Sequence, residues 1–291
     1  MDTAKCKAFV TAAETGSFSA AAERLHYTPS GVSQLVTALE REMDLTLLHR
    51  TRQGVRLTAS GEQVIGAVRI FLQQAERVEQ LAAELNDLHT GTITIASYPS
   101  MTMRWLPSLL EEFGRMYPNI RIHLREGERR EFVEWLHSGE VDLAFLARGD
   151  LLEGDWLPLA DDPIVALLPK NHPMAGEEAF PIDRLKEERF IMGCQGLDTD
   201  TVELLRSYGV EPKVFYSTVN GISVLPMVEH GLGISVMNAL ISTCCPFEGV
   251  KLPLDPPHFL TLGILVPNLE EAPPAARRFI DFAVRRLTQE E

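Results

Sequence analysis

The sequence has no run of about 18 consecutive apolar residues, the length at which a segment becomes a candidate membrane span. Its N-terminus, Met1 to Lys5, also lacks the apolar segment that directs secretion. These two absences argue against a membrane protein and an exported one. We therefore expect a cytoplasmic protein.

Cysteine is scarce, with four residues at positions 6, 194, 244 and 245. None of them has the spacing of a zinc site, and adjacent cysteines such as Cys244 and Cys245 rarely bridge each other. Thiols stay reduced in the cytoplasm. We expect buried, reduced cysteines and no metal site.

Short motifs of the common enzyme classes are missing. The chain has no G-x-S-x-G elbow, no P-loop, no dinucleotide-binding glycine string and no H-E-x-x-H. Its eight histidines are scattered without metal spacing. These absences predict that the chain is not an enzyme and has no catalytic residue, metal or cofactor.

What the chain does have is enough length and apolar content for more than one folded unit. It holds 291 residues, of which 45% are hydrophobic. A single domain normally contains about 100–200 residues. Two or three units are expected.

The most informative segment runs from Gly16 to Leu39 and predicts two short helices joined by a tight turn. Ser17 and Thr28 can cap the two helices, and Pro29 suits the first position of the second one. Apolar residues recur at helical spacing in the second helix, at Val32, Leu35, Val36 and Leu39. Its opposite face is polar, with Ser30, Ser33, Gln34 and Thr37. This layout is typical of a helix-turn-helix that places its second helix in the DNA major groove.

A basic hairpin is predicted next, over residues 47–58, around Gln53 and Gly54. It carries Arg50, Arg52 and Arg56, which as the wing of a winged helix-turn-helix would contact phosphates or the minor groove. Two helices of this kind also occur in domains that do not bind DNA, but the basic hairpin favours DNA binding.

Net charge agrees with this assignment once it is divided along the chain. The whole chain carries −14, whereas residues 1–61 hold seven Lys or Arg and six Asp or Glu, a net of +1. The remainder therefore carries −15 and would repel DNA. The N-terminal unit is the predicted contact surface, and we expect weak nonspecific binding.

Residues 1–61 resemble the N-terminal domain of LysR-type transcriptional regulators, and the resemblance extends over essentially the whole chain. The matching residues are Phe9-Val10, GSFSAAAERL from Gly16, Val32-Ser33, Leu39-Glu40, Leu47-Leu48, Arg50, Leu57-Thr58 and Gly61. Three positions depart from the family pattern: Gly31 replaces Ala, Asp44 replaces Gly and Leu48 replaces Phe. Asp tolerates the left-handed backbone that a turn at position 44 would need.

The resemblance and the residues together predict a set of DNA contacts. The groove-facing set is Thr28, Pro29, Ser30, Ser33, Gln34 and Thr37. Arg50, Arg52 and Arg56 are assigned to the backbone or the minor groove. Double-stranded operator DNA and RNA polymerase are the expected macromolecular partners.

A long helix over residues 62–88 is expected to connect this head to the rest of the chain. Its apolar positions follow a heptad seam at Val64, Val68, Phe71, Ala75, Val78, Ala82 and Leu85, widened by Leu81 and Leu88. The seam fits either a dimer or a helix packed on its own domain. A polar flank over residues 73–80 suits a free-standing rod, which favours a homodimer, and the family resemblance implies a homotetramer.

Residues 89–291 alternate strand and helix, which predicts an α/β domain with a parallel sheet. The alternation restarts near residue 164, so we expect two lobes like those of periplasmic solute-binding proteins. Lobe I is assigned residues 92–162 and 267–291, and lobe II residues 163–266. The predicted crossings lie at Asp162–Leu167 and Leu262–Val266. The resemblance makes this the effector-binding domain, which holds a small molecule between its lobes.

Ligands of open α/β sheets bind at the carboxyl ends of strands. The candidate contacts at such ends are Ser97, Ser100, Met101, Thr102, Arg148, Asp198, Thr199, Thr218 and Asn220. Free amides after Tyr98 would favour a carboxylate. Arg148 together with the acidic Asp198 and Asp200 would suit an effector that carries both a carboxylate and an amine. Ordinary helix capping is the alternative role for each Ser, Thr and Asp.

Three alternatives remain beside a ligand-controlled regulator. A small-molecule enzyme with a helical head would turn over its ligand, and an exported solute-binding protein would not bind DNA. Some LysR-type regulators sense peroxide through a cysteine pair, but Cys194 has no second cysteine within about ten residues.

Overall fold

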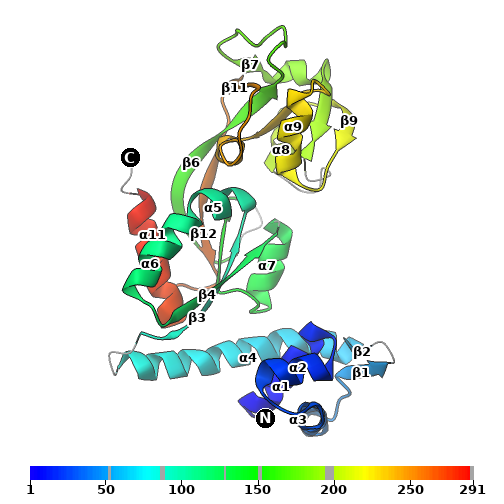
Figure 1. The fold of residues 1–291 in the computed structure, drawn as a ribbon, viewed down its shortest axis with the longest axis vertical. Coiled ribbons are helices and arrows are strands. Elements are labelled where there is room, and N and C mark those ends of the chain that lie inside the picture. Colours follow the sequence, from blue (N-terminus) through cyan, green and yellow to red (C-terminus); the bar gives the residue numbers. More distant parts are fainter. Residues whose placement is uncertain (52–53, 86–88, 128, 150–152, 194–199, 289–291) are drawn as a thin grey trace.

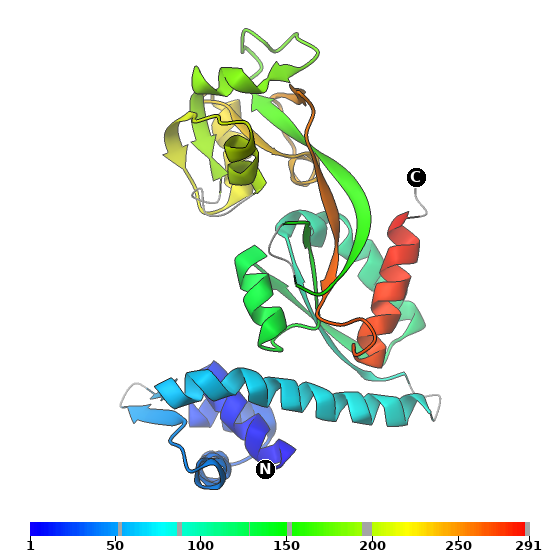
Figure 2. The same cartoon turned by 180° about the vertical axis from the view of Figure 1, so that it is seen from behind.

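The computed structural model describes residues 1–51, 54–85, 89–127, 129–149, 153–193 and 200–288. Figure 1 shows a helical head, one long helix and two α/β lobes arranged along a single axis. The long helix lies crosswise between the head and the first lobe, and the second lobe lies at the far end (Figures 1 and 2).

The head is the predicted winged helix-turn-helix. Its elements are α1 Thr3–Thr15, α2 Phe18–Leu25, α3 Pro29–Met43, β1 Leu48–Thr51 and β2 Gly54–Leu57. Val32, Val36 and Leu39 of α3 are fully buried in its core, as their spacing predicts, and Leu35 packs against that core. Asp44 ends α3 with φ 52°, in the left-handed region that the sequence predicts for it.

The long helix α4 spans Ala59–Glu84 and packs on both of its neighbours. Ile65 and Val68 are buried against the head. Arg69 donates to Glu140 Oε1 of lobe I at 2.8 Å, and Gln80 Oε1 accepts the amide of Ala275 at 3.2 Å. The expected free-standing rod is therefore wrong, because its polar flank pairs with lobe I.

The predicted heptad seam is divided between two environments. Val64, Val68 and Phe71 pack into the head's own core. Further along, Val78, Leu81 and Leu85 stay exposed to solvent, as does Ile70, which precedes Phe71 and is not a seam position. Only the second half of the predicted seam is thus available to a second chain.

Lobe I is a sheet covered by helices on both faces. Its strands are β3 Gly91–Ser97, β4 Ile120–Glu126, β5 Leu143–Ala147, β12 Phe259–Val266 and the first half of β6 Asp155–Leu168. Its helices are α5 Pro99–Arg104, α6 Leu106–Met116, α7 Arg129–His137 and α11 Pro274–Thr288. Strand β3 runs parallel to β4 and β5 as predicted, but β12 is antiparallel to β5 and β6, so the sheet is mixed.

Lobe II is built on the second half of β6. Its other strands are β7 Phe180–Pro181, β8 Arg189–Met192, β9 Lys213–Ser217, β10 Ser235–Asn238 and β11 Val250–Asp255. Its helices are α8 Asp200–Ser207, α9 Val224–Glu229 and α10 Ala239–Ser242, with 3-10 turns η1 Ile182–Lys186 and η3 Gly221–Ser223.

Two passages of the chain join the lobes. One is β6, which pairs with β12 up to Pro163 and with β10 from Ile164, at the predicted first crossing. The second lies between β11 and β12, because Leu262 to Leu265 already pair with β5. The prediction that residues 262–266 cross between lobes is wrong, and β12 belongs to lobe I rather than lobe II.

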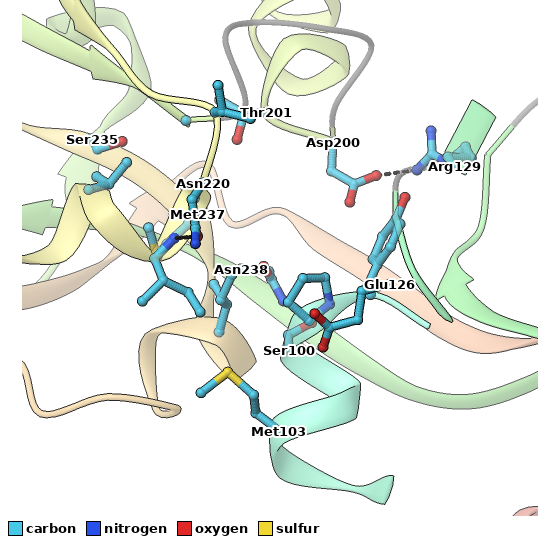
Figure 3. Close-up of a pocket in the computed structure, with 18 of the residues that line it drawn as sticks. Ser100, Met103, Glu126, Arg129, Asp200, Thr201, Asn220, Ser235, Met237 and Asn238 are labelled. Carbon is cyan, nitrogen blue, oxygen red and sulfur yellow. Dashed lines mark hydrogen bonds and ion pairs between the residues drawn. The ribbon is translucent and has the colours of Figure 1, made fainter. Parts of the chain in front are cut away.

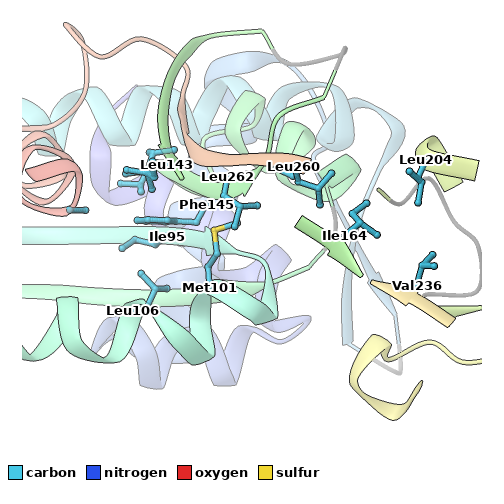
Figure 4. Packing of buried hydrophobic residues seen from close by; sticks show 14 of the residues in the cluster. Ile95, Met101, Leu106, Leu143, Phe145, Ile164, Leu204, Val236, Leu260 and Leu262 are labelled. Atoms are coloured by element: carbon cyan, nitrogen blue, oxygen red, sulfur yellow. The ribbon is translucent and has the colours of Figure 1, made fainter. Parts of the chain in front are cut away.

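One apolar core cluster runs through both lobes (Figure 4). Ile95, Met101 and Phe145 lie in lobe I, whereas Leu204 and Val236 lie in lobe II. Among the described helices, none is long and apolar enough to span a bilayer.

Candidate functional site

The polar face of α3 is held outward by its cap and its buried opposite face. The amide of Gly31 donates to Thr28 Oγ1 at 3.1 Å, so Thr28 caps α3 as predicted. Thr28, Pro29, Ser30 and Gln34 are exposed and Ser33 is half-buried. The predicted groove residues therefore form one accessible surface at the start of α3.

The wing is fixed to this helix by backbone contacts. Glu40 Oε1 of α3 accepts the amides of Leu47 and Leu48, at 2.8 and 3.1 Å. The amide of Val55 donates to the carbonyl of Gly16 at 2.7 Å, which joins the wing to the turn between α1 and α2. The hairpin is thus oriented by the same helices that orient α3.

The wing arginines differ in their contacts with the rest of the head. Arg50 donates to Thr37 Oγ1 at 3.1 Å and its guanidinium lies 5.0 Å from the centre of the Phe18 ring. Arg56 is exposed on β2 with no partner among the described residues. Arg52 lies outside the described residues. Thr37 is half-buried, as Ser33 is, and its hydroxyl is in addition engaged with Arg50.

A cavity of about 500 Å³ lies between the lobes, a size typical of small-molecule sites. Lobe I supplies α5 and the residues after β4, and lobe II supplies the start of α8, the η3 turn and the end of β10 (Figure 3). Ser100 and Asn220, two of the predicted effector contacts, line it.

The other predicted effector contacts have different positions. Five of them do not line this cavity. Ser97 and Met101 are fully buried, and Arg148 is exposed elsewhere. The hydroxyls of Thr102 and Thr218 donate to the backbone carbonyls of Tyr98 and Asn220. Asp198 and Thr199 lie outside the described residues, as does Cys194. The amides of Met101 and Thr102 donate to the Tyr98 carbonyl at 3.0 Å, so these two amides are not available to an anion.

The arginine that lines the cavity is Arg129, which the sequence analysis did not predict as an effector contact. It is only 7% exposed and pairs across the lobes with Asp200 and with Glu203, whose Oε1 lies 2.5 Å from Nη1. Burial raises the pKa of Asp200 to about 6, and the Arg129 guanidinium opposes that rise. Burial also raises the pKa of the neighbouring Tyr98, whose phenol therefore stays neutral.

The preference of ligands for the carboxyl ends of strands could have indicated this site from the sequence. Glu126 ends β4 and Arg129 begins α7 three residues later, so both follow the carboxyl end of a strand. Figure 3 shows Glu126 near Ser100, and Arg129 beside Asp200. Among the described residues, no three His, Cys, Asp or Glu side chains are grouped as a metal site would require.

An outward-facing recognition helix with a basic wing, joined by one long helix to a two-lobed domain with a cavity, defines a ligand-responsive transcriptional regulator. Residues 4–62 match the profile of the bacterial regulatory helix-turn-helix proteins of the lysR family. Residues 86–288 match that of the LysR substrate binding domain. The chain belongs to the LysR family of transcriptional regulators, which is not a family of enzymes.

Individual proteins agree with this assignment over nearly the full length. The chain is 32% identical to the uncharacterized HTH-type transcriptional regulator YvbU of Bacillus subtilis, covering 97% of this chain and 98% of that protein. A full-length OxyR variant from Pseudomonas aeruginosa has the same fold, with a TM-score of 0.79, 23% identity and coverage of 99% of this chain and 98% of that one. Full-length CbnR, solved with its target DNA, gives a TM-score of 0.55 and 22% identity, with coverage of 99% and 100%.

Proposed function

We propose that residues 1–61 read an operator through the exposed start of α3. Ser30, Ser33 and Gln34 would contact base edges, Pro29 a thymine methyl group, and Thr28 and Thr37 the flanking positions. Arg50, Arg52 and Arg56 would hold the phosphate backbone or the minor groove. The observation that carries this proposal is the accessible polar surface of α3, held beside a basic wing in a LysR-family head.

Selection of genomic fragments by the purified full chain at near-physiological salt tests this proposal. We expect recovery of a few intergenic sites that share an interrupted palindrome. Recovery of fragments without any shared sequence would contradict it. Action on chromosomal DNA would place the protein in the cytoplasm.

Arg56→Ala is expected to weaken binding to operator and scrambled duplexes alike, by about three- to tenfold. A phosphate contact carries no sequence information, and its loss reduces the slope of log affinity against log salt by about 0.9. Fluorescence anisotropy across a salt series measures both quantities. Arg121→Ala, an exposed arginine of β4, is the matched control. A loss confined to the operator would show that Arg56 reads bases instead.

We infer that two chains pair along the exposed second half of α4. Val78 is 66% exposed and Leu85, at the end of the helix, 88%, and with Leu81 they recur at helical spacing on one side of the helix. A homodimer would present two α3 helices to half-sites about one helical turn apart. Pairing of dimers into a homotetramer, and contact with RNA polymerase, are further proposals that rest on the family.

Val78→Asp combined with Leu81→Asp is expected to convert the dimer to a monomer at micromolar concentration, because buried charges without partners oppose association. Sedimentation velocity measures this. Met116→Asp, which also charges an exposed apolar side chain, serves as the control and should remain dimeric. An unchanged sedimentation coefficient in the double variant would place the dimer interface elsewhere.

The cavity between the lobes is proposed to bind the small-molecule effector, which changes the relative orientation of the lobes. Lobe I is coupled to the head through α4, since Arg69 contacts Glu140 of lobe I at 2.8 Å and Glu14 of α1 at 3.5 Å. A reoriented lobe would thus bias the arrangement of the dimers, the bend of the operator and the access of RNA polymerase. Only a ligand that prefers one arrangement can act in this way.

A further inference from the structure

The positive charge in the cavity is already neutralised by the protein itself. Arg129 is the only cationic residue among the described lining residues. Each of its terminal nitrogens is paired with a carboxylate of the opposite lobe, one from Asp200 and one from Glu203. Its Nε has no hydrogen-bond partner among the described residues but is buried, so an anionic ligand would reach the terminal nitrogens only by displacing a carboxylate.

One negative charge in the cavity, that of Glu126, remains available to a ligand. Three described lining residues are acidic, Glu126, Glu131 and Asp200, against the single Arg129. Glu126 is exposed at the end of β4, and no described residue pairs with its carboxylate. Figure 3 shows it near Ser100.

Two neutral polar residues of the wall, Asn238 and Ser235, offer acceptors, whereas Asn220 accepts the amide of Ile222 and keeps its own amide nitrogen as a donor. Asn238 uses its amide nitrogen on Asp162 Oδ2 at 2.6 Å, and Ser235 donates its hydroxyl to the Ile191 carbonyl at 2.7 Å. Their remaining capacity in the cavity is the amide oxygen and the hydroxyl lone pairs. A ligand rich in N–H donors suits such a wall.

Apolar side chains supply much of the remaining surface. Met103 and Val219 are 42% and 70% exposed at the cavity, and Ile222 and Ile241 line it beside them. Burying such side chains under a ligand is favourable in proportion to the area covered. The ligand should therefore combine a charged group with an apolar body.

We propose that this cavity selects a small organic cation, an ammonium group on an apolar body, with Glu126 as its counter-ion. The proposal rests on the proposed function of the cavity as the effector site. The ammonium would lie between the Glu126 carboxylate, Ser100 and the amide oxygen of Asn238, and the body against Met103 and Ile241. This organic cation replaces the expected ligand with both a carboxylate and an amine, because Arg148 does not line the cavity.

Calorimetric titration of the full chain at pH 7.5 tests the charge preference. The probes are benzylammonium and butylammonium, each with its alcohol and carboxylate counterpart. We expect at least one ammonium compound to bind about tenfold or more tightly than its counterparts, as a charge-assisted hydrogen bond provides. Equal or tighter binding of the carboxylates, or no preference for either ammonium compound, would overturn the proposal.

Two variants make the test specific to named residues. Glu126→Gln should weaken binding of the ammonium compound about tenfold without changing the melting temperature, whereas Glu178→Gln, an exposed glutamate of lobe II, should change neither. Asp200→Asn combined with Glu203→Gln frees Arg129 and should create measurable binding of benzoate. Ammonium binding that is insensitive to Glu126→Gln would overturn the assignment of the counter-ion.

Ile241→Trp, which fills the cavity, separates failure of this proposal from failure of the proposed function. If carboxylates bind the wild-type chain and the substitution abolishes that binding, the cation proposal fails and the effector site stands. If the substitution leaves the binding of every probe unchanged, the cavity is not the ligand site and both fail.

Discussion

Replacing Ser33 and Gln34 of α3 together with alanine is expected to lower affinity for the operator roughly 100-fold, since each good base contact contributes about 1–3 kcal/mol of discrimination. Affinity for scrambled DNA should fall less than about threefold, because phosphate contacts supply nonspecific binding. Both side chains are accessible on the face opposite the buried Val32, Val36 and Leu39, so their removal leaves the core of the head intact.

Anisotropy titrations of the two duplexes, at one fixed salt concentration, measure the ratio that this prediction concerns. The matched control replaces Ser108 of α6 and Gln63 of α4, a serine and a glutamine outside the proposed interface. An equal loss of affinity on operator and scrambled DNA would assign the two α3 residues to the backbone rather than to bases.

Gly61→Ala is expected to destabilise the head by about 2–3 kcal/mol, as overpacking of a tightly packed site does. A Cβ at Gly61 would lie 2.2 Å from the carbonyl oxygen of Leu47 and 3.0 Å from Leu57. The carbonyl belongs to the backbone at the base of the wing, where Thr58 also caps α4, so it cannot move without shifting the wing.

Denaturant titration measures this effect by two signals. Trp105, Trp135 and Trp156 all lie in lobe I, so their fluorescence reports that lobe, whereas far-ultraviolet circular dichroism includes the helices of the head. We expect the dichroism transition to move to lower denaturant and the fluorescence transition to change much less. Gly114→Ala, where a Cβ would meet nothing within 4 Å, is the control and should be neutral or stabilising. An unchanged dichroism transition in Gly61→Ala would contradict the packing argument.

The helical head could be predicted closely because its signals are local. Caps at Ser17 and Thr28, the proline at Pro29 and the spacing of Val32, Val36 and Leu39 all act within a few residues of chain, and each has its predicted place in the structure. The same holds for the hairpin, whose two strands adjoin each other in sequence.

Contacts between distant segments were harder to predict. Arg129 pairs with Asp200 and Glu203 only because β6 carries the chain across to lobe II. No residue pattern near position 129 predicts that pairing. The polar flank of α4 has the composition of a solvent-exposed surface, yet Gln73 and Gln80 pair with lobe I. Polar residues that bond to another domain and polar residues that bond to water look alike in one sequence.

The assignment of β12 to a lobe also depends on contacts between distant segments. Its residues Leu262 to Val266 have the apolar run of a buried strand, which the sequence predicts. Their lobe depends on which strand they pair with, and that partner is β5, more than 100 residues earlier in the chain.

The central claim is that a dimer of this chain reads two half-sites at a fixed spacing, and a spacing series tests it most directly. The selected operator is compared with versions that have about five or about ten extra base pairs between the half-sites, half a turn and a full turn of DNA. We predict that the half-turn insertion reduces affinity to that of scrambled DNA and that the full-turn insertion costs less. Equal affinity for all three duplexes would contradict the account, because a rigid pair of recognition helices cannot follow a half-site to the opposite face of the DNA.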